Sequence, residues 1–255
     1  MDILSDDGAM ALEMAAAESD PDSLGAAERL RRRFPSELAA AALTQVALRR
    51  RARGKLPMAE QMFFTPDGLE QATRWVVARW RAARFVDTGV SEVWDLGCGI
   101  GVDAMALSEA GLGVHAVELD PVTAALARAN LALVGGGEVT VGRAEDVQVP
   151  EWGGIFLDPA RRTARGRTWD VADLTPPWPL VEGHLTGEQA AIAKLGPGLP
   201  KQLIPDGAGA AWVSVGGDVV EVMLSNISPP GPRAVVFPRG ETEPDILVRG
   251  AGPLP

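Results

Sequence analysis

The sequence predicts an α/β fold, in which a doubly wound and mostly parallel sheet follows a helical N-terminal segment. From residue 91 onward, short apolar runs rich in Val, Ile and Leu alternate with helical stretches, a pattern typical of parallel sheets covered by helices. Residues 1–54 are rich in Ala, Leu, Arg and Glu, which are good helix formers. A glycine-rich turn directly follows the first apolar run, a position where α/β sheets bind ligands.

The N-terminal helical segment ends at a recognisable break. Pro35 and Ser36 restart a helix after Phe34, because proline is tolerated only near a helix start. Lys55-Leu56-Pro57 interrupts the helical pattern. We therefore expect a helical subdomain over residues 1–54, the main domain over residues 55–250 and a short tail over residues 251–255.

A further helix is predicted to begin at Thr65-Pro66, because Thr is a good N-cap and Pro fits the first helical position. Apolar side chains continue it at helical spacing and indicate a core-facing stripe: Leu69, Ala72, Val76, Trp80 and Ala83. Helices are then expected at 102–110 and 121–133. The expected strands are 91–97, 113–119, 138–142, 153–159, 190–196, 210–215, 219–224 and 233–238.

Composition excludes several classes of protein. Of the 255 residues, 46% are hydrophobic and 23% charged, which is ordinary for a soluble globular chain. No stretch approaches the ~20 apolar residues of a membrane-spanning helix, and the acidic start MDILSDDG lacks signal-peptide features. We expect a cytoplasmic protein. With one cysteine and two histidines, we expect no intrachain disulfide and no metal centre.

The charge is unevenly distributed. The net charge of −10 argues against nucleic acid as a partner. Residues 29–55, however, combine one anion with nine cations: Arg29, Arg31, Arg32, Arg33, Arg49, Arg50, Arg51, Arg53 and Lys55. This basic arm on an acidic body keeps RNA open as a partner.

The strongest motif is the glycine loop Gly97-Cys98-Gly99-Ile100-Gly101, which runs from a strand that contains Asp95 into a helix. Glycines there permit a tight turn and let a ligand lie against the backbone. Glu118 follows 21 residues after Gly97, at the end of the second expected strand. An acid in that place suits a ribose diol. The alternative is a glycine turn in a domain that binds no nucleotide.

The GxGxG spacing, the preceding Asp and the acid after the second strand together resemble the S-adenosylmethionine site of class I methyltransferases. The resemblance implies a Rossmann-like methyltransferase sheet with S-adenosylmethionine as cofactor. It implies that the glycine loop contacts the methionine part through Gly97, Gly99 and Gly101, and that Glu118 binds the ribose. Asp95 would brace the loop or reach the cofactor amine.

The adenine contact is expected near the end of the third strand. The family often has an acid directly after the glycine there, whereas this chain has Arg143 after Gly142. The role therefore shifts to Glu145 or Asp146. Cys98 lies inside the glycine loop, so this chain lacks the cysteine nucleophile that cytosine-C5 methyltransferases carry beyond the fourth strand.

A second motif, GGIFLDPARR, follows the fourth expected strand. In class I enzymes this edge faces the transferable methyl group, which implies catalytic roles for Asp158 and Pro159. Amino-methylating families carry Pro-Pro-aromatic there, whereas here Ala160 and Arg161 follow Pro159. The later Thr175-Pro176-Pro177-Trp178 segment could supply the aromatic through Trp178, or Trp178 could pack in the core.

Arginines follow this second motif closely. Arg161, Arg162 and Arg165 suit contacts to substrate phosphates. The alternative is a solvated surface loop.

The segment KLPMAEQMFFTPDGLEQAT, the glycine motif and FLDPARR together resemble the bacterial THUMP-like methyltransferases and, distantly, trimethylguanosine synthase. Phe64 and Thr65 match an aromatic–Thr-Pro segment that helps to close the cofactor site in those enzymes. The resemblance implies methylation of a base nitrogen in structured RNA. A small molecule or a protein as substrate, and a non-catalytic RNA- or cofactor-binding scaffold, remain alternatives.

Overall fold

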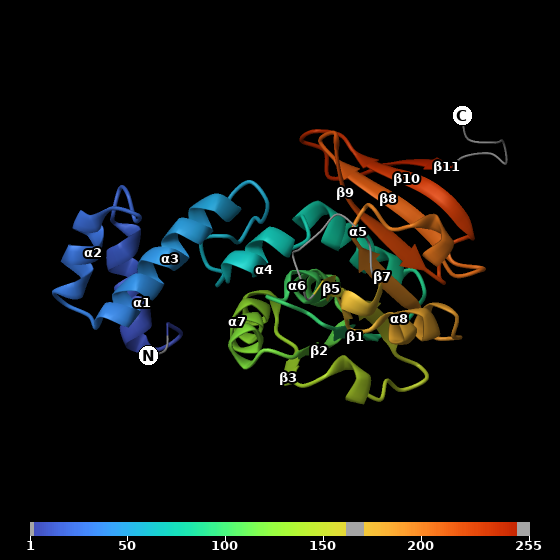
Figure 1. Ribbon diagram of the computed structural model, residues 1–255, viewed down its shortest axis with the longest axis horizontal. Helices are drawn as coiled ribbons and strands as arrows, with labels where there is room; N and C mark the ends of the chain where they lie inside the picture. Colours follow the sequence, from blue (N-terminus) through green and yellow to red (C-terminus); the bar gives the residue numbers. More distant parts are fainter. Residues whose placement is uncertain (1–2, 162–170, 249–255) are drawn as a thin grey trace.

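The computed structural model describes residues 3–161 and 171–248, and Figure 1 shows a central sheet flanked by helices. The nine-stranded sheet has the order β11-β10-β8-β9-β7-β4-β1-β2-β3. Its strands are β1 (Glu92–Leu96), β2 (Gly113–Glu118), β3 (Glu138–Val141), β4 (Gly154–Leu157), β7 (Ala191–Leu195), β8 (Gly209–Val215), β9 (Asp218–Ser225), β10 (Gly231–Phe237) and β11 (Asp245–Val248). The predicted α/β class is confirmed.

The sheet is parallel in one half and mixed in the other. Strands β3, β2, β1, β4 and β7 run parallel to one another. Strand β9 is antiparallel to both β7 and β8, β10 is parallel to β8, and β11 closes the edge antiparallel to β10. The chain builds β1 to β3 in one direction and then places β4 on the other side of β1. Its topological switch point therefore lies between β1 and β4.

Alternation along the strands sends side chains into two separate cores. Val93 and Phe156 face the layer that contains α5 (Trp75–Val86), α6 (Val102–Glu109) and α7 (Pro121–Leu131). Trp94 and Ile155 face the opposite layer, which contains α8 (Trp178–Leu185). Among the helices of the described residues, none has the length and apolar character needed to cross a bilayer.

The N-terminal helices α1 (Asp6–Ala16), α2 (Leu24–Arg31) and α3 (Ser36–Ala52) form a bundle that projects from the sheet at one end of the molecule (Figure 1). Serines cap the first two helices, since Ser5 accepts from Gly8 N–H and Ser23 accepts from Ala26 N–H. The bundle has a core of its own, with Leu30 and Leu38 fully buried. The domain boundary near residue 54 stays a prediction.

Two side-chain amides join this bundle and the sheet layers to the segment that precedes α4 (Pro66–Gln71). Gln45 of α3 donates to Phe64 C=O at 2.7 Å and accepts from Phe64 N–H at 2.9 Å. Asn130 of α7 binds the C=O and N–H groups of Phe63 in the same way. The backbone before α4 is therefore held from both sides.

The predicted continuous helix from residue 65 to 83 is wrong, because the structure divides it into α4 and α5. The break lies at Ala72–Arg74, where the Thr73 hydroxyl donates to the Asp103 carboxylate at 2.6 Å. This buried bond turns the backbone out of the helical path. The structure also contains α8, β11 and a small hairpin of β5 (Ala160–Arg161) and β6 (Leu174–Thr175), none of which the sequence indicated.

The Gln45 bonds yield a stability prediction. Gln45→Leu would leave both the N–H and the C=O of buried Phe64 without partners, and we expect it to lower the free energy of unfolding by about 2–4 kcal/mol. Urea denaturation measures this loss. Gln61→Leu at a nearby exposed position is the control, with an expected change within about 0.5 kcal/mol. Equal effects of the two substitutions would contradict the role of the Gln45 bonds.

Candidate functional site

A cavity of about 620 Å³ opens at the carboxyl ends of β1 to β4, at the switch point of the sheet. Gly97 and Glu118, which end or follow β1 and β2, contribute to its lining, as do Arg143 after β3 and Asp158 after β4. Helix α4 forms the wall that faces these strand ends, through Thr65, Asp67, Gly68 and Gln71. This is the place where open α/β sheets bind ligands.

The three glycines of the loop have backbone angles that favour glycine. Their φ values are +97° at Gly97, +55° at Gly99 and +85° at Gly101. A Cβ atom at Gly97 would lie 3.3 Å from Cδ of Pro176, which packs over the loop. A Cβ atom at Gly99 would meet no protein atom within 4 Å. Since Gly99 lines the cavity, the missing side chain leaves room for a ligand against the backbone.

Glu118 holds the glycine loop in place while lining the cavity. One carboxylate oxygen accepts from Gly99 N–H at 3.0 Å, and the other accepts from Asp120 N–H at 2.9 Å. Each oxygen has a further lone pair. The carboxylate can therefore brace the loop and still accept hydrogen bonds from a ligand.

The other expected cofactor residues divide into those at the cavity and those away from it. Thr65 caps α4 by accepting from Gly68 N–H at 2.9 Å, and Glu145 pairs with Arg143 at 2.5 Å. Both Thr65 and Glu145 line the cavity. Asp146 is exposed and is not among the lining residues. Of the two alternatives for the adenine contact, the geometry favours Glu145.

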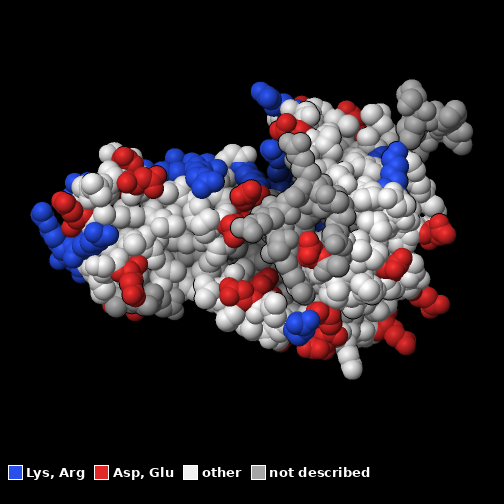
Figure 2. Space-filling model, in the orientation of Figure 1, with Lys and Arg blue, Asp and Glu red and all other residues white. Residues whose placement is uncertain are grey.

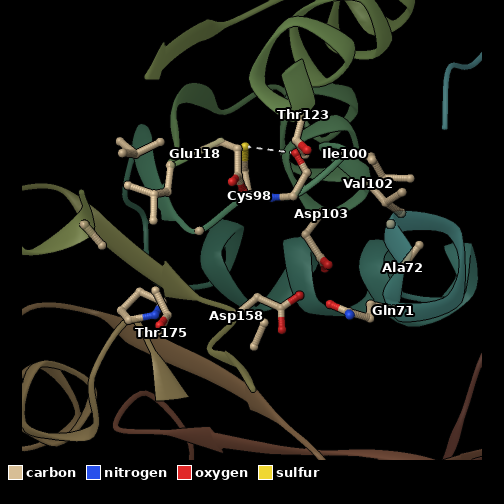
Figure 3. Close-up of a pocket in the computed structure, with 18 of the residues that line it drawn as sticks. Gln71, Ala72, Cys98, Ile100, Val102, Asp103, Glu118, Thr123, Asp158 and Thr175 are labelled. Atoms are coloured by element: carbon tan, nitrogen blue, oxygen red, sulfur yellow. Dashed lines mark hydrogen bonds between the residues drawn. The ribbon is translucent and has the colours of Figure 1, made fainter. Parts of the chain in front are cut away.

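Asp158 lines the cavity and forms an ion pair with Lys194 of β7 at 2.5 Å. The Lys194 ammonium also donates to Gln71 C=O at 3.2 Å, and so ties the carboxylate to the end of α4. Burial raises the pKa of Asp158, and Lys194 opposes that shift. In Figure 3 the side chains of Asp158, Asp103 and Gln71 point toward one part of the cavity, away from Glu118.

Arg81 of α5 lies behind this part of the cavity and is 1% exposed. It forms ion pairs with Asp103 of α6 and with Glu221 of β9. Burial alone would lower the pKa of Arg81, but Asp103 and Glu221 outweigh it and raise that pKa. Sequence reasoning missed Arg81, Lys194 and Glu221. For Lys194 and Glu221 the available signal was a charged residue within an otherwise apolar strand, whereas Arg81 is one of three arginines in its helix and gave no such signal.

Asp95 is fully buried, and neither of its carboxyl oxygens has a hydrogen-bond partner. It does not line the cavity. Burial raises the pKa of Asp95 well above its usual value, and the nearby carboxylates of Asp103 and Asp158 add to the shift. The geometry gives Asp95 no bond to the glycine loop, so bracing the loop falls to Glu118.

Cys98 is poorly suited to act as a nucleophile. Burial raises the pKa of its thiol well above the usual range, and the carboxylates of Asp95 and Glu118 add to this effect. The thiol therefore stays protonated at neutral pH. This agrees with Cys98 as a small residue in a tight turn.

The structure brings only part of the expected acceptor site together. Pro159 is buried beside Asp158 and does not line the cavity. Trp178 begins α8, is 7% exposed and packs in the core with Leu174 and Val181. Of the two alternatives for Trp178, the structure has core packing, because α8 turns its apolar face to the sheet. The cavity instead receives Thr175 and Pro176.

The expected phosphate-binding arginines are largely outside the part that the structure describes. Arg161 lies in β5, next to cavity-lining Ala160. Arg162 and Arg165 lie outside the described residues. Their role stays a prediction.

The basic arm is distributed over the N-terminal helices, and none of its residues lines the cavity. Arg29 and Arg53 pair with glutamates, whereas Arg49, Arg50 and Lys55 donate to backbone carbonyls. Arg31, Arg32 and Arg33 lie at the end of α2, and Figure 2 shows cations gathered at that end of the molecule. The arm does not converge on the cavity.

Comparison with known proteins relates the chain to methyltransferases. Residues 2–52 match a family described only as a domain of unknown function, DUF8688. The chain is 38% identical over 136 residues to two curated Mycobacterium tuberculosis proteins, from strains CDC 1551 and H37Rv, each named an uncharacterized S-adenosylmethionine-dependent methyltransferase. The alignment covers 51% of this chain but only 37% of each relative. The narrower resemblance to THUMP-like enzymes and trimethylguanosine synthase is not confirmed by these names.

The fold also resembles a solved structure. A crystal structure from Porphyromonas gingivalis W83, described as a methyltransferase, superposes with a TM-score of 0.67 at 23% sequence identity. The match covers 94% of this chain and 65% of that one. The chain therefore has a Rossmann-like methyltransferase fold.

The isolation of Asp95 yields a prediction for stability against pH. Its folded-state pKa is raised, so folding takes up a proton, and stability is lost as pH rises from the unfolded value of about 4 toward the folded one. Asp95→Asn removes this titration. Between these two pKa values, the free energy of unfolding of Asp95→Asn should rise relative to that of the wild type by about 1.4 kcal/mol per pH unit.

Urea denaturation at several pH values measures this difference. Asp146→Asn, which changes an exposed carboxylate, serves as the control. A gap between Asp95→Asn and wild type that does not vary with pH would show that Asp95 is ionised in the folded protein.

Proposed function

We propose that this chain is an S-adenosylmethionine-dependent methyltransferase with its cofactor site in the cavity over the glycine loop. The observation that carries the proposal is the convergence of three independent features on one cavity. These are the glycine loop after β1, Glu118 after β2 and Asp158 after β4. The names of the Mycobacterium tuberculosis relatives support the same activity.

The residues present fit this cofactor. The open space at Gly99 lets the methionine part lie against the loop backbone. The free lone pairs of Glu118 suit the two ribose hydroxyls, and Glu145 lies near the end of β3, where the adenine is expected. The cofactor supplies a methyl group activated by its sulfonium. The volume of the cavity is in the range of small-molecule sites.

The Asp158 carboxylate and the Lys194 ammonium are the polar groups that would act at the end of the cavity where the methyl acceptor binds. Methyl transfer to an amine needs the nitrogen lone pair aligned with the methyl carbon, and the protein mainly supplies that alignment. The Asp158 carboxylate, 29% exposed, can accept a proton from the attacking nitrogen. Lys194 holds the carboxylate by its ion pair and by its bond to Gln71 C=O. Lys194 is thus a positioning residue.

The chemical class of the methyl acceptor is a separate question from the activity. RNA is supported by the arginines that follow Asp158 in sequence. The basic arm adds no support, since none of its cations lines the cavity and five of them bind glutamates or carbonyls within the chain. The described lining also contains no aromatic side chain to stack on a base. We therefore place a small-molecule or protein amine first and a base nitrogen of RNA second.

The cofactor assignment predicts the effect of removing the Glu118 carboxylate. Charge-assisted bonds to the ribose, and the two bonds that shape the loop, would be lost together. Glu118→Ala should weaken S-adenosylmethionine binding by about tenfold or more, measured by calorimetry. Asp146→Ala, an exposed acid away from the cavity, should leave the dissociation constant unchanged. Unchanged affinity in Glu118→Ala would overturn the ribose assignment.

Transfer of a tritiated methyl group into a cell extract identifies the class of acceptor. We expect label in the low-mass or the protein fraction, lost in Asp158→Asn because this variant cannot accept the amine proton. The same variant should bind S-adenosylhomocysteine within about twofold of wild type. Label that is sensitive to ribonuclease would instead establish RNA as the acceptor. Cofactor binding without transfer to any fraction would favour a non-catalytic scaffold.

A further inference from the structure

Six ionisable side chains lie together beneath the acceptor end of the cavity, and they form what we term the charge cluster: Asp95, Asp103, Asp158, Glu221, Arg81 and Lys194. Four of them lie on neighbouring strands of the sheet or directly after one: Asp95 on β1, Asp158 after β4, Lys194 on β7 and Glu221 on β9. Each of these four lies two positions along its strand from an apolar residue that packs under α5 and α6, namely Val93, Phe156, Ile192 or Met223. Strand periodicity thus places them on one face of the sheet.

The charges of this cluster do not balance. Arg81 pairs with both Asp103 and Glu221, and Lys194 pairs with Asp158. Asp95 has no hydrogen-bond partner, and burial raises its pKa, which favours the neutral form of this carboxyl group. Even with Asp95 counted as neutral, three carboxylates face two cations, which leaves one excess negative charge among largely buried side chains. Charge in such surroundings is weakly screened.

This negative charge borders the cavity directly. Asp103 and Asp158 both line it, and their side chains point into the same space in Figure 3. Arg81 and Glu221 are 1% and 3% exposed and lie behind them. Among the described residues, a ligand at this end of the cavity therefore contacts the carboxylates of Asp103 and Asp158 directly, whereas the Arg81 guanidinium lies behind them.

We propose that the charge cluster makes the cavity bind positively charged S-adenosylmethionine more tightly than neutral S-adenosylhomocysteine, and so favours release of the spent cofactor. This proposal rests on the proposed function. In methyl transfer the acceptor lone pair forms the new N–C bond, and the electron pair of the broken C–S bond stays on sulfur. The sulfonium becomes a neutral thioether, while the amine proton passes to Asp158 and then to solvent. The cofactor thereby loses the charge that the cluster attracts.

A purely structural role accounts less well for the cluster. Burying ion pairs is costly, and well-packed apolar residues in their place are often as stable or more stable. The unpartnered Asp95 adds a further cost without any bond in return. A preference for a cationic ligand accounts for the excess of carboxyl groups beside this end of the cavity.

The test compares three ligands by calorimetry with the whole chain. S-adenosylmethionine should bind about tenfold more tightly than S-adenosylhomocysteine. Sinefungin, which carries a protonated amine in place of the sulfonium, should bind like S-adenosylmethionine. Equal affinities, or tighter binding of S-adenosylhomocysteine, would overturn the proposal while leaving the cofactor site intact. If neither cofactor form binds, the proposed function itself fails.

Two variants tie the preference to the charge of the cluster. Asp158→Asn makes the cluster neutral, and the ratio of the two affinities should fall by about fivefold or more. The double variant with Lys194→Met removes the pair and restores one excess negative charge, so the ratio should recover in part. Asp67→Asn, on the exposed wall of the same cavity, is the matched control and should leave the ratio within about twofold. Thermal unfolding checks that each variant is folded.

An unchanged ratio in Asp158→Asn, or a further fall in the double variant, would show that the charge of the cluster does not set the preference. Either result would overturn the proposal. The wild-type comparison of ligands stands without any variant, so a variant that fails to fold still leaves the proposal open to contradiction.

Discussion

The buried guanidinium of Arg81 is the interaction on which the arrangement of the cavity depends. It joins Asp103 on α6 to Glu221 on β9, which follow Arg81 by 22 and 140 residues in the sequence. Its carbon Cζ lies 4.9 Å from the ring centre of Phe156, on the strand that leads to Asp158. Removing one partner of such a pair would leave an uncompensated buried charge and would strongly destabilise the fold. The three elements are therefore held in one relative position.

The break between α4 and α5 follows from the same interaction. Asp103 accepts from both Arg81 and the Thr73 hydroxyl. Thr73 lies in the middle of the short segment between the two helices, so this bond fixes where α4 ends and how it faces the strands. Lys194 and Lys55 then bind the last carbonyls of α4. The cavity wall is thus set by long-range polar bonds rather than by helix propensity.

This explains which parts of the site the sequence predicts. The glycine loop and Glu118 follow from local signals, because a strand, a tight turn and a helix in order leave few conformations open. The α4–α5 break and the core position of Trp178 depend on partners far away in the chain. Arg81 and Glu221, for example, are separated by 140 residues. A single sequence shows the charged residues in these segments but not their pairing.

The N-terminal bundle and the sheet meet at α4, and this sets how the two parts can influence each other. Gln45 binds both backbone groups of Phe64, and Thr65 directly after it caps α4. Any shift of α3 would therefore move the start of the helix that forms the cavity wall. The end of that helix is fixed independently by Lys194, which also holds Asp158. The bundle is thus coupled to the cavity through one short helix, although its own cations lie elsewhere.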